Sequence, residues 1–159
     1  PPAKAVLPPS DVVERGRASY SKYCVGCHGE SAVGGIPNVN AANSVIPPLN
    51  LLARQMAFAR ATEVDAFLAI VRGLNGTPIE NSDAVRLANW PQIQPTIAAT
   101  RAVIIQGLSV RAVDATGPEP FDMPSWRQLI DAGQTDAIIA YLLTTTPWDD
   151  PPATGPRLP

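Results

Sequence analysis

The residues of this chain best suited to chemistry are two cysteines and a histidine within five consecutive positions. Cys24 and Cys27 are separated by two residues, and His28 follows directly. Two thiols at this spacing can add to the two vinyl groups of one haem edge and form thioethers, and the adjacent imidazole can then bind the iron. The motif therefore predicts covalent attachment of one haem c, with His28 as an iron ligand.

Two other kinds of site use the same residue types, namely a thioredoxin-like redox pair and a zinc centre. A redox pair of this spacing is typical of a βαβ unit, and the sequence contains no alternating strand pattern of useful length. A four-ligand zinc site needs further Cys or His residues, but the chain has only two cysteines and one histidine. Haem attachment is therefore the favoured interpretation.

Composition restricts the class of protein further. The chain has 159 residues, 45% of them hydrophobic and 16% charged, which favours one folded globular domain over a disordered chain. Its net charge of −2 gives no general basic surface for phosphate, so we expect no nucleic acid partner. No apolar run is long enough to span a bilayer.

Proline marks the two ends of the chain, which contains 18 prolines. Residues 1–9 are predicted to be a proline-rich arm, residues 10–147 the folded domain and residues 148–159 a proline-rich tail. Apolar residues at helical spacing predict helices over about 11–24, 51–60, 62–72, 82–89 and 96–107, and a last one from Gln134 or Thr135 to Pro147. The predicted fold class is all-α.

The first predicted helix places Gly16, Tyr20 and Cys24 on one face, because residues four positions apart are neighbours on a helix surface. A glycine inside a helix costs about 1 kcal/mol relative to alanine. This cost is explained if another helix approaches closely at Gly16. The alternative is a glycine that is merely tolerated.

Beyond the haem motif, the sequence resembles the class I c-type cytochromes. The N-terminal helix of that family carries a glycine, an aromatic residue and the first haem cysteine at four-residue intervals, as Gly16, Tyr20 and Cys24 do here. Its C-terminal helix carries an apolar residue three positions before an aromatic one, matched by Ile138 and Tyr141. The resemblance implies a cytochrome c-like fold with crossing N- and C-terminal helices and one covalently bound haem.

The resemblance also implies which residues complete the haem site. A proline carbonyl accepts a hydrogen bond from the ligand histidine and fixes its orientation, and Pro47 is our first choice, with Pro48 second. The second axial ligand of the family is a methionine. Met123 is followed by Pro124, as in the Met-Pro segment of the family, whereas Met56 lies among apolar residues, where methionine is more typical of core packing.

The chain departs from compact members of the family in the length of sequence before Met123. Residues 70–76 resemble the usual lead-in to the methionine loop, but Ile79 stands where a methionine is expected. Residues 102–108 resemble that lead-in a second time. We therefore predict an insertion within about residues 77–120 that covers part of the haem or forms a docking surface.

The favoured function is one-electron transfer, because His/Met ligation leaves no iron position for a substrate. The expected partners are redox proteins that act as donor and acceptor. The chain would be a free carrier or the cytochrome subunit of a membrane-associated respiratory or dehydrogenase complex, and the arm at residues 1–9 favours tethering to a membrane anchor or a larger complex. By resemblance, haem attachment is completed outside the bacterial cytoplasm, so we expect the periplasm or the outer face of the cytoplasmic membrane.

The alternative is a haem enzyme or gas sensor with an open sixth iron position. It requires that Met123 does not bind, so that peroxide, nitric oxide or carbon monoxide can. The chain has no second histidine for a distal pocket, and Arg101 or Arg127 would have to serve. Arg101 and Trp90 are also candidate donors to the haem propionates, although ordinary core and surface roles are favoured for both.

Overall fold

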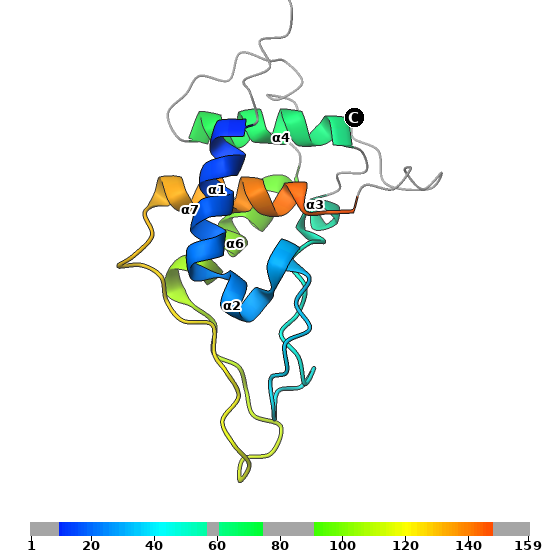
Figure 1. Cartoon of the computed structure of the whole chain (residues 1–159), viewed down its shortest axis with the longest axis vertical. Coiled ribbons are helices and arrows are strands. Elements are labelled where there is room, and N and C mark those ends of the chain that lie inside the picture. Colours follow the sequence, from blue (N-terminus) through cyan, green and yellow to red (C-terminus); the bar gives the residue numbers. More distant parts are fainter. Residues whose placement is uncertain (1–9, 57–60, 75–90, 148–159) are drawn as a thin grey trace, which may run out of the picture.

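The structure is a computed structural model that describes residues 10–56, 61–74 and 91–147. Within these ranges the regular elements are all helices, and the only extended pairings are isolated bridges, so the predicted all-α class is confirmed. The helices are α1 (Ser10–Tyr23), α2 (Val25–His28), the 3-10 helix η1 (Glu30–Ala32), α3 (Leu52–Gln55), α4 (Ala61–Leu74), α6 (Ile93–Gln106) and α7 (Ala132–Thr144) (Figure 1). None of the described helices is both long and apolar enough to cross a membrane.

Helices α1 and α7 cross at very close range (Figure 1). A Cβ atom placed on Gly16 would lie 1.9 Å from the carbonyl oxygen of Ala137 and 2.9 Å from the Cβ atom of Tyr141. Next to this contact the rings of Tyr20 and Tyr141 pack with their centroids 5.2 Å apart. The close helix approach predicted from Gly16 is therefore confirmed.

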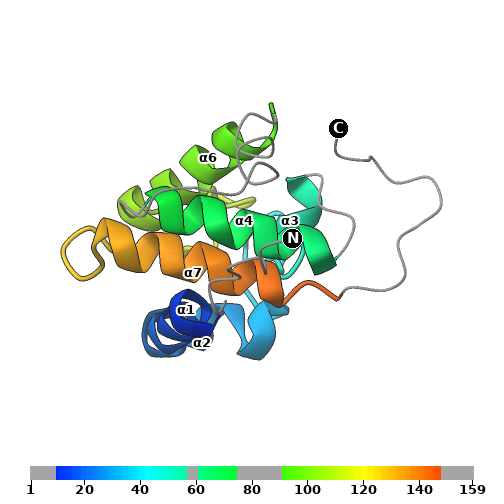
Figure 2. The same cartoon turned by 90° about the horizontal axis from the view of Figure 1, so that it is seen from above.

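The core surrounds α7, which lies between α1 on one side and α4 and α6 on the other (Figure 2). Every residue of α7 from Thr135 to Ala140 is buried, as expected for a helix that is covered on all its faces. Met56 is 0% exposed and belongs to the same core. Met56 is therefore a core-packing residue, as predicted from the sequence.

Two helices, α6 and α7, begin two or more residues earlier than predicted. Helix α7 begins at Ala132 rather than at Gln134 or Thr135, because Asp131 caps it: the Asp131 carboxylate accepts a hydrogen bond from the Gln134 N–H, and the Gln134 side chain accepts one from the Asp131 N–H. Helix α6 begins at Ile93, and Pro95 lies in its first turn, where the missing proline N–H has no helical partner to lose.

Other predictions fall partly or wholly outside the described residues. Only the start of the helix predicted over 51–60 is seen, as the short helix α3. The helix predicted over 82–89, the arm at 1–9 and the tail at 148–159 lie outside the described ranges. The predicted insertion is described only from residue 91 onward, where it comprises α6 and the loop that follows, and it stays a prediction.

Two long loops extend from the helices on the side where α2 lies (Figure 1). The first loop, residues 33–51, follows η1, and the second loop, residues 107–131, joins α6 to α7. The loops meet at an isolated antiparallel bridge between Ala41 and Ala112. Because the first loop follows His28 and the second contains Met123, their pairing sets the relation between the two predicted iron ligands.

Candidate haem site

The haem motif lies at the junction of α1 and α2. Cys24 directly follows α1 and is the N-cap residue of α2, which contains Cys27 and ends at His28. The backbone N–H groups of Cys27 and His28 both donate to the Cys24 carbonyl, at 3.2 and 2.9 Å. This tight turn holds the three side chains within one short segment, with Cys24 buried and Cys27 exposed.

His28 and Met123 line the same cavity, although one follows α1 and the other precedes α7. The cavity has a volume of about 500 Å³, within the range of about 300–1,000 Å³ that is usual for cofactor sites. Most of its walls are apolar. The other lining residues are Pro48, Leu49, Leu52, Gln55, Pro95, Thr96, Ala99, Thr100, Val103, Ile104 and Leu142.

The residues of this cavity fit a c-type haem. Its apolar walls suit the porphyrin ring, and imidazole nitrogen and thioether sulfur are the donors used by His/Met-ligated haem proteins. Of the two methionines, Met123 lines the cavity and Met56 does not. The geometry therefore favours Met123 over Met56 as the second iron ligand, and this ligand assignment stays a prediction.

The surroundings of His28 favour its neutral form. Burial lowers the pKa of the imidazole, and the Pro47 carbonyl opposes this change. Nδ1 of His28 is buried and makes no hydrogen bond of ordinary geometry within the described structure, so the Pro47 carbonyl acts as a nearby dipole rather than as a fully formed partner. Pro48, in contrast, lines the cavity. Because the Pro47 carbonyl is the one that acts on His28, Pro47 is favoured over Pro48 for the predicted role of orienting the imidazole. The neutral imidazole is also the form that binds iron.

Gly34 sets the position of the two prolines, and the sequence alone did not identify it. Its φ is +63°, and a Cβ atom there would lie 2.6 Å from the Ile46 carbonyl oxygen and 2.7 Å from the carbonyl carbon of Pro47. Its N–H donates to the His28 carbonyl at 2.9 Å. Gly34 therefore joins the end of α2 to the segment that carries Pro47; the only sequence signal was the Gly34-Gly35 pair.

Gly107 has the same role for Met123, and the sequence alone did not identify it either. Its φ is +77°, and a Cβ atom there would lie 2.5 Å from the Met123 carbonyl oxygen. The backbones of Leu108 and Met123 exchange two hydrogen bonds, both of 2.9 Å, and the Ser125 hydroxyl donates to the Ile105 carbonyl at 2.6 Å. The end of α6 thus anchors the segment that carries Met123.

Tyr20 and, before haem attachment, the Cys24 thiol are protonated in this environment. Burial raises the pKa of Tyr20 to about 12, with a smaller contribution from Cys24, and burial raises the pKa of Cys24 to about 11. The protonated Tyr20 hydroxyl donates a hydrogen bond of 2.6 Å to the Gly29 carbonyl. This bond ties α1 to the residue that directly follows the haem motif.

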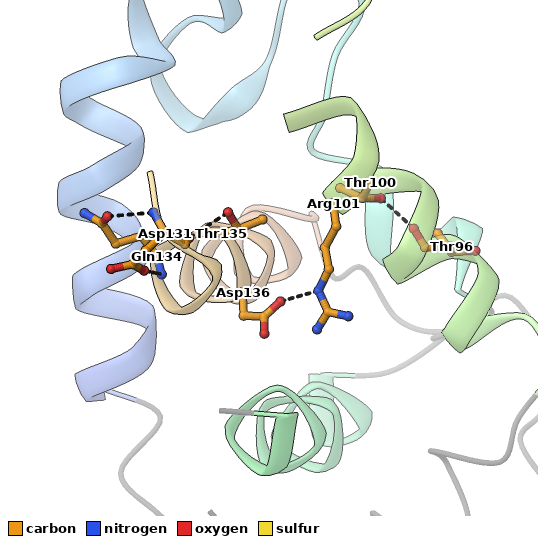
Figure 3. A network of polar contacts seen from close by, with 7 residues as sticks. All are labelled: Thr96, Thr100, Arg101, Asp131, Gln134, Thr135 and Asp136. Atoms are coloured by element: carbon orange, nitrogen blue, oxygen red, sulfur yellow. Dashed lines mark hydrogen bonds and ion pairs between the residues drawn. The ribbon is translucent and has the colours of Figure 1, made fainter. Parts of the chain in front are cut away.

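Arg101 belongs to a structural network rather than to the cavity (Figure 3). Its Nε atom donates to Oδ1 of Asp136 at 2.6 Å, and the Asp136 side chain is only 6% exposed. The ion pair joins α6 to α7, which agrees with the ordinary role favoured for Arg101. Trp90 lies outside the described residues, so its predicted role stays open.

Comparison with protein families agrees with this geometry. A family model described as cytochrome c oxidase, cbb3-type, subunit III matches residues 11–142. The chain belongs to this family. Membership in the family confirms the resemblance to class I c-type cytochromes and the cytochrome c-like fold. From this membership it follows that the chain is a c-type cytochrome domain that binds haem c, takes part in electron transfer and has redox proteins as partners. No curated protein and no solved structure matches the chain.

Proposed function

We propose that this cytochrome domain is a one-electron carrier in which His28 and Met123 are the two axial ligands of a single haem c bound through Cys24 and Cys27. The observation that carries the proposal is the shared cavity, which both side chains line. When bound, the haem supplies a reversible ferric/ferrous couple. The protein holds the two donors, excludes water with apolar walls and thereby limits the iron to electron exchange.

The proposed iron ligands, His28 and Met123, determine whether the reduction potential of the haem is raised or lowered. A methionine thioether favours the reduced iron, so His/Met ligation raises the reduction potential. The exposed position of Cys27 supports electron exchange at the haem edge nearest to α2. Contacts with free partners would be small and short-lived, as is usual for electron-transfer encounters.

We also propose that the domain works within a larger assembly. The family description names an oxidase subunit, which supports a role as the cytochrome subunit of a membrane-associated respiratory complex, with a dehydrogenase complex as the related case. The arm at residues 1–9 would tether the domain to a membrane anchor or to the complex. The proposed location is the periplasm or the outer face of the cytoplasmic membrane.

An enzyme or gas sensor with an open iron position finds no comparable support. Among the described residues that line the cavity, His28 is the only titratable one. Arg101 is paired with Asp136, and Arg127 does not line the cavity. The described walls therefore provide no charged or imidazole group to activate a ligand on the distal side.

The two methionines provide a matched test of this proposal. Replacing methionine by leucine keeps the volume and removes the sulfur, so Met123→Leu should abolish the far-red absorption band that thioether ligation gives to oxidised haem iron, whereas Met56→Leu should keep it. Haem should remain attached in both variants after denaturation. A band that is missing from the wild-type protein, or that survives Met123→Leu, would show that Met123 is not a ligand.

A further inference from the structure

Asn38, in the first loop, holds the backbone of the second loop close to Met123. The residue is only 4% exposed. Its Nδ2 atom donates to the Phe121 carbonyl at 3.1 Å, and its Oδ1 atom accepts from the Phe121 N–H at 2.7 Å. One amide side chain thus satisfies both backbone groups of a residue that lies two positions before Met123.

Asn40 makes a second link between the loops, farther from Met123 in the sequence. Its Nδ2 atom donates to the carbonyls of Asp114 and Pro118 at 2.8 and 2.7 Å, and its Oδ1 atom accepts from the Asp114 N–H at 2.8 Å. The Asn40 carbonyl also accepts from the Val113 N–H at 2.9 Å. Asn40 therefore holds residues 113–118, whereas Asn38 holds Phe121, two positions before Met123.

The side chain of Phe121 contributes little to this contact, because Phe121 is 66% exposed. The segment is held instead by Asn38 at the backbone of Phe121, by the Val110 N–H, which donates to the Asp122 carboxylate at 2.6 Å, and by the paired backbone bonds between Leu108 and Met123. Leu108 lies two residues after the end of α6. Asn38 is the contact that comes from the loop following His28, so it couples the two sides of the haem cavity.

Loss of the Asn38 amide would leave two backbone groups of Phe121 without their partner. These two bonds are partly buried, and a backbone N–H or C=O group that loses such a bond is stabilised again only when it moves to where water can replace the lost partner. Such a movement at Phe121 would pull on Met123 two residues later, while Cys24 and Cys27 would be unaffected. The expected result is a weaker bond from Met123 to iron without loss of haem.

We propose that Asn38 is a positioning residue for the second axial ligand, because its amide fixes the backbone at Phe121 and so keeps the Met123 thioether directed into the cavity. This inference rests on the proposed function, since it requires Met123 to bind iron. Asn40 supports the loop but does not have this role. The distinction between the two asparagines makes the proposal testable.

Carbon monoxide binding to the reduced, haem-loaded protein provides the readout, because carbon monoxide binds the iron only when Met123 has left it. We expect Asn38→Ala to bind carbon monoxide about tenfold faster than wild type, which corresponds to about 1.4 kcal/mol. The far-red band of the oxidised variant should weaken in parallel. Covalent haem content and helical circular dichroism should match those of wild type.

Three further variants separate the Asn38 contact from general loosening of the loop. Phe121→Ala removes a side chain and keeps both hydrogen bonds, and Asn40→Gly removes the second link without strain at a residue whose φ is +65°. We expect both to bind carbon monoxide within about twofold of the wild-type rate. Phe121→Pro removes the N–H that donates to Oδ1 of Asn38, and it should accelerate carbon monoxide binding as Asn38→Ala does.

The outcomes distinguish this inference from the proposed function. If the wild-type protein has the far-red band but Asn38→Ala and Phe121→Pro bind carbon monoxide at its rate, Asn38 does not position Met123. The same conclusion follows if Asn40→Gly accelerates binding as much as Asn38→Ala. If Asn38→Ala does not fold, Phe121→Pro decides. A wild-type protein that lacks the band and binds carbon monoxide at once would overturn the proposed function itself.

Discussion

Gly107, which directly follows α6, lies against the backbone of Met123 so closely that a Cβ atom would stand 2.5 Å from the Met123 carbonyl oxygen. The contact joins the end of a core helix to the residue proposed as the second iron ligand. It leaves no space for any side chain at position 107. The position of Met123 therefore depends on a glycine that touches only its backbone.

Replacing Gly107 by alanine should destabilise the protein more than the same change at Gly35. Both residues have positive φ, +77° and +82°, but a Cβ atom added at Gly35 would meet nothing within 4 Å. Gly35→Ala should cost about 1–2 kcal/mol for its backbone conformation alone, and Gly107→Ala should cost about 1–3 kcal/mol more because of the clash. Denaturant unfolding of the haem-loaded variants measures both; equal losses would show that the contact with Met123 is not tight.

The crossing of α1 and α7 gives a second glycine comparison. Gly16→Ala places a methyl group against the Ala137 carbonyl, so the helices must separate, whereas Gly26 in α2 has nothing within 4 Å. We expect Gly16→Ala to lose about 1–3 kcal/mol of stability and Gly26→Ala to gain about 0.5–1 kcal/mol as a better helix former. Thermal unfolding of the two variants checks the prediction, and an unchanged melting temperature for Gly16→Ala would contradict it.

Part of this structure could be predicted from sequence because the relevant signals are local. The spacing of Cys24, Cys27 and His28 identifies the haem motif, and Gly16 within a helical pattern indicates the close crossing. The capping box of Asp131 and Gln134 is also a local signal, and it places the start of α7 at Ala132. Arg101 and Asp136, 35 positions apart, pair only because α6 packs against α7, and nothing near either residue predicts the contact.

The positioning of the ligands could not be predicted, because it depends on contacts between two loops that are distant in sequence. Gly34 and Gly107 have functional meaning only when the backbone that packs on each of them is known. Asn38 bonds to Phe121 across 83 positions. Asparagine and glycine are ordinary loop residues, so their types alone did not distinguish these roles.

The ion pair between Arg101 and Asp136 should matter more than an exposed one. Arg101→Met leaves the Asp136 carboxylate, 6% exposed, without its partner; because the Arg101 side chain is 33% exposed, the loss should reach at most about 3 kcal/mol, the lower end for a buried pair. The matched change is Arg17→Met, which breaks a pair with Glu14 whose side chains are 53% and 62% exposed; it should change the stability very little, because water and salt screen an exposed pair. Urea unfolding compares the two, and similar losses would mean that burial does not strengthen the contact.

Tyr20 should make the protein less stable at high pH. Its pKa is raised in the folded state from 10.0 to about 12, so the folded protein resists ionisation of the phenol. The resulting stability is fully present below pH 10 and is lost as the pH rises through the folded pKa of about 12. Tyr20→Phe cannot ionise and should show a flatter decline over this interval in unfolding experiments. Parallel declines for the two proteins would rule out Tyr20 as the cause.

Proton nuclear magnetic resonance of the reduced protein tests the central claim most directly. The ε-methyl group of a methionine bound to haem iron lies over the porphyrin ring, whose ring current moves its signal far upfield. We predict one such signal in the wild-type protein, its retention in Met56→Leu and its loss in Met123→Leu. A wild-type spectrum without the signal, or a signal that persists in Met123→Leu, would contradict His28/Met123 ligation.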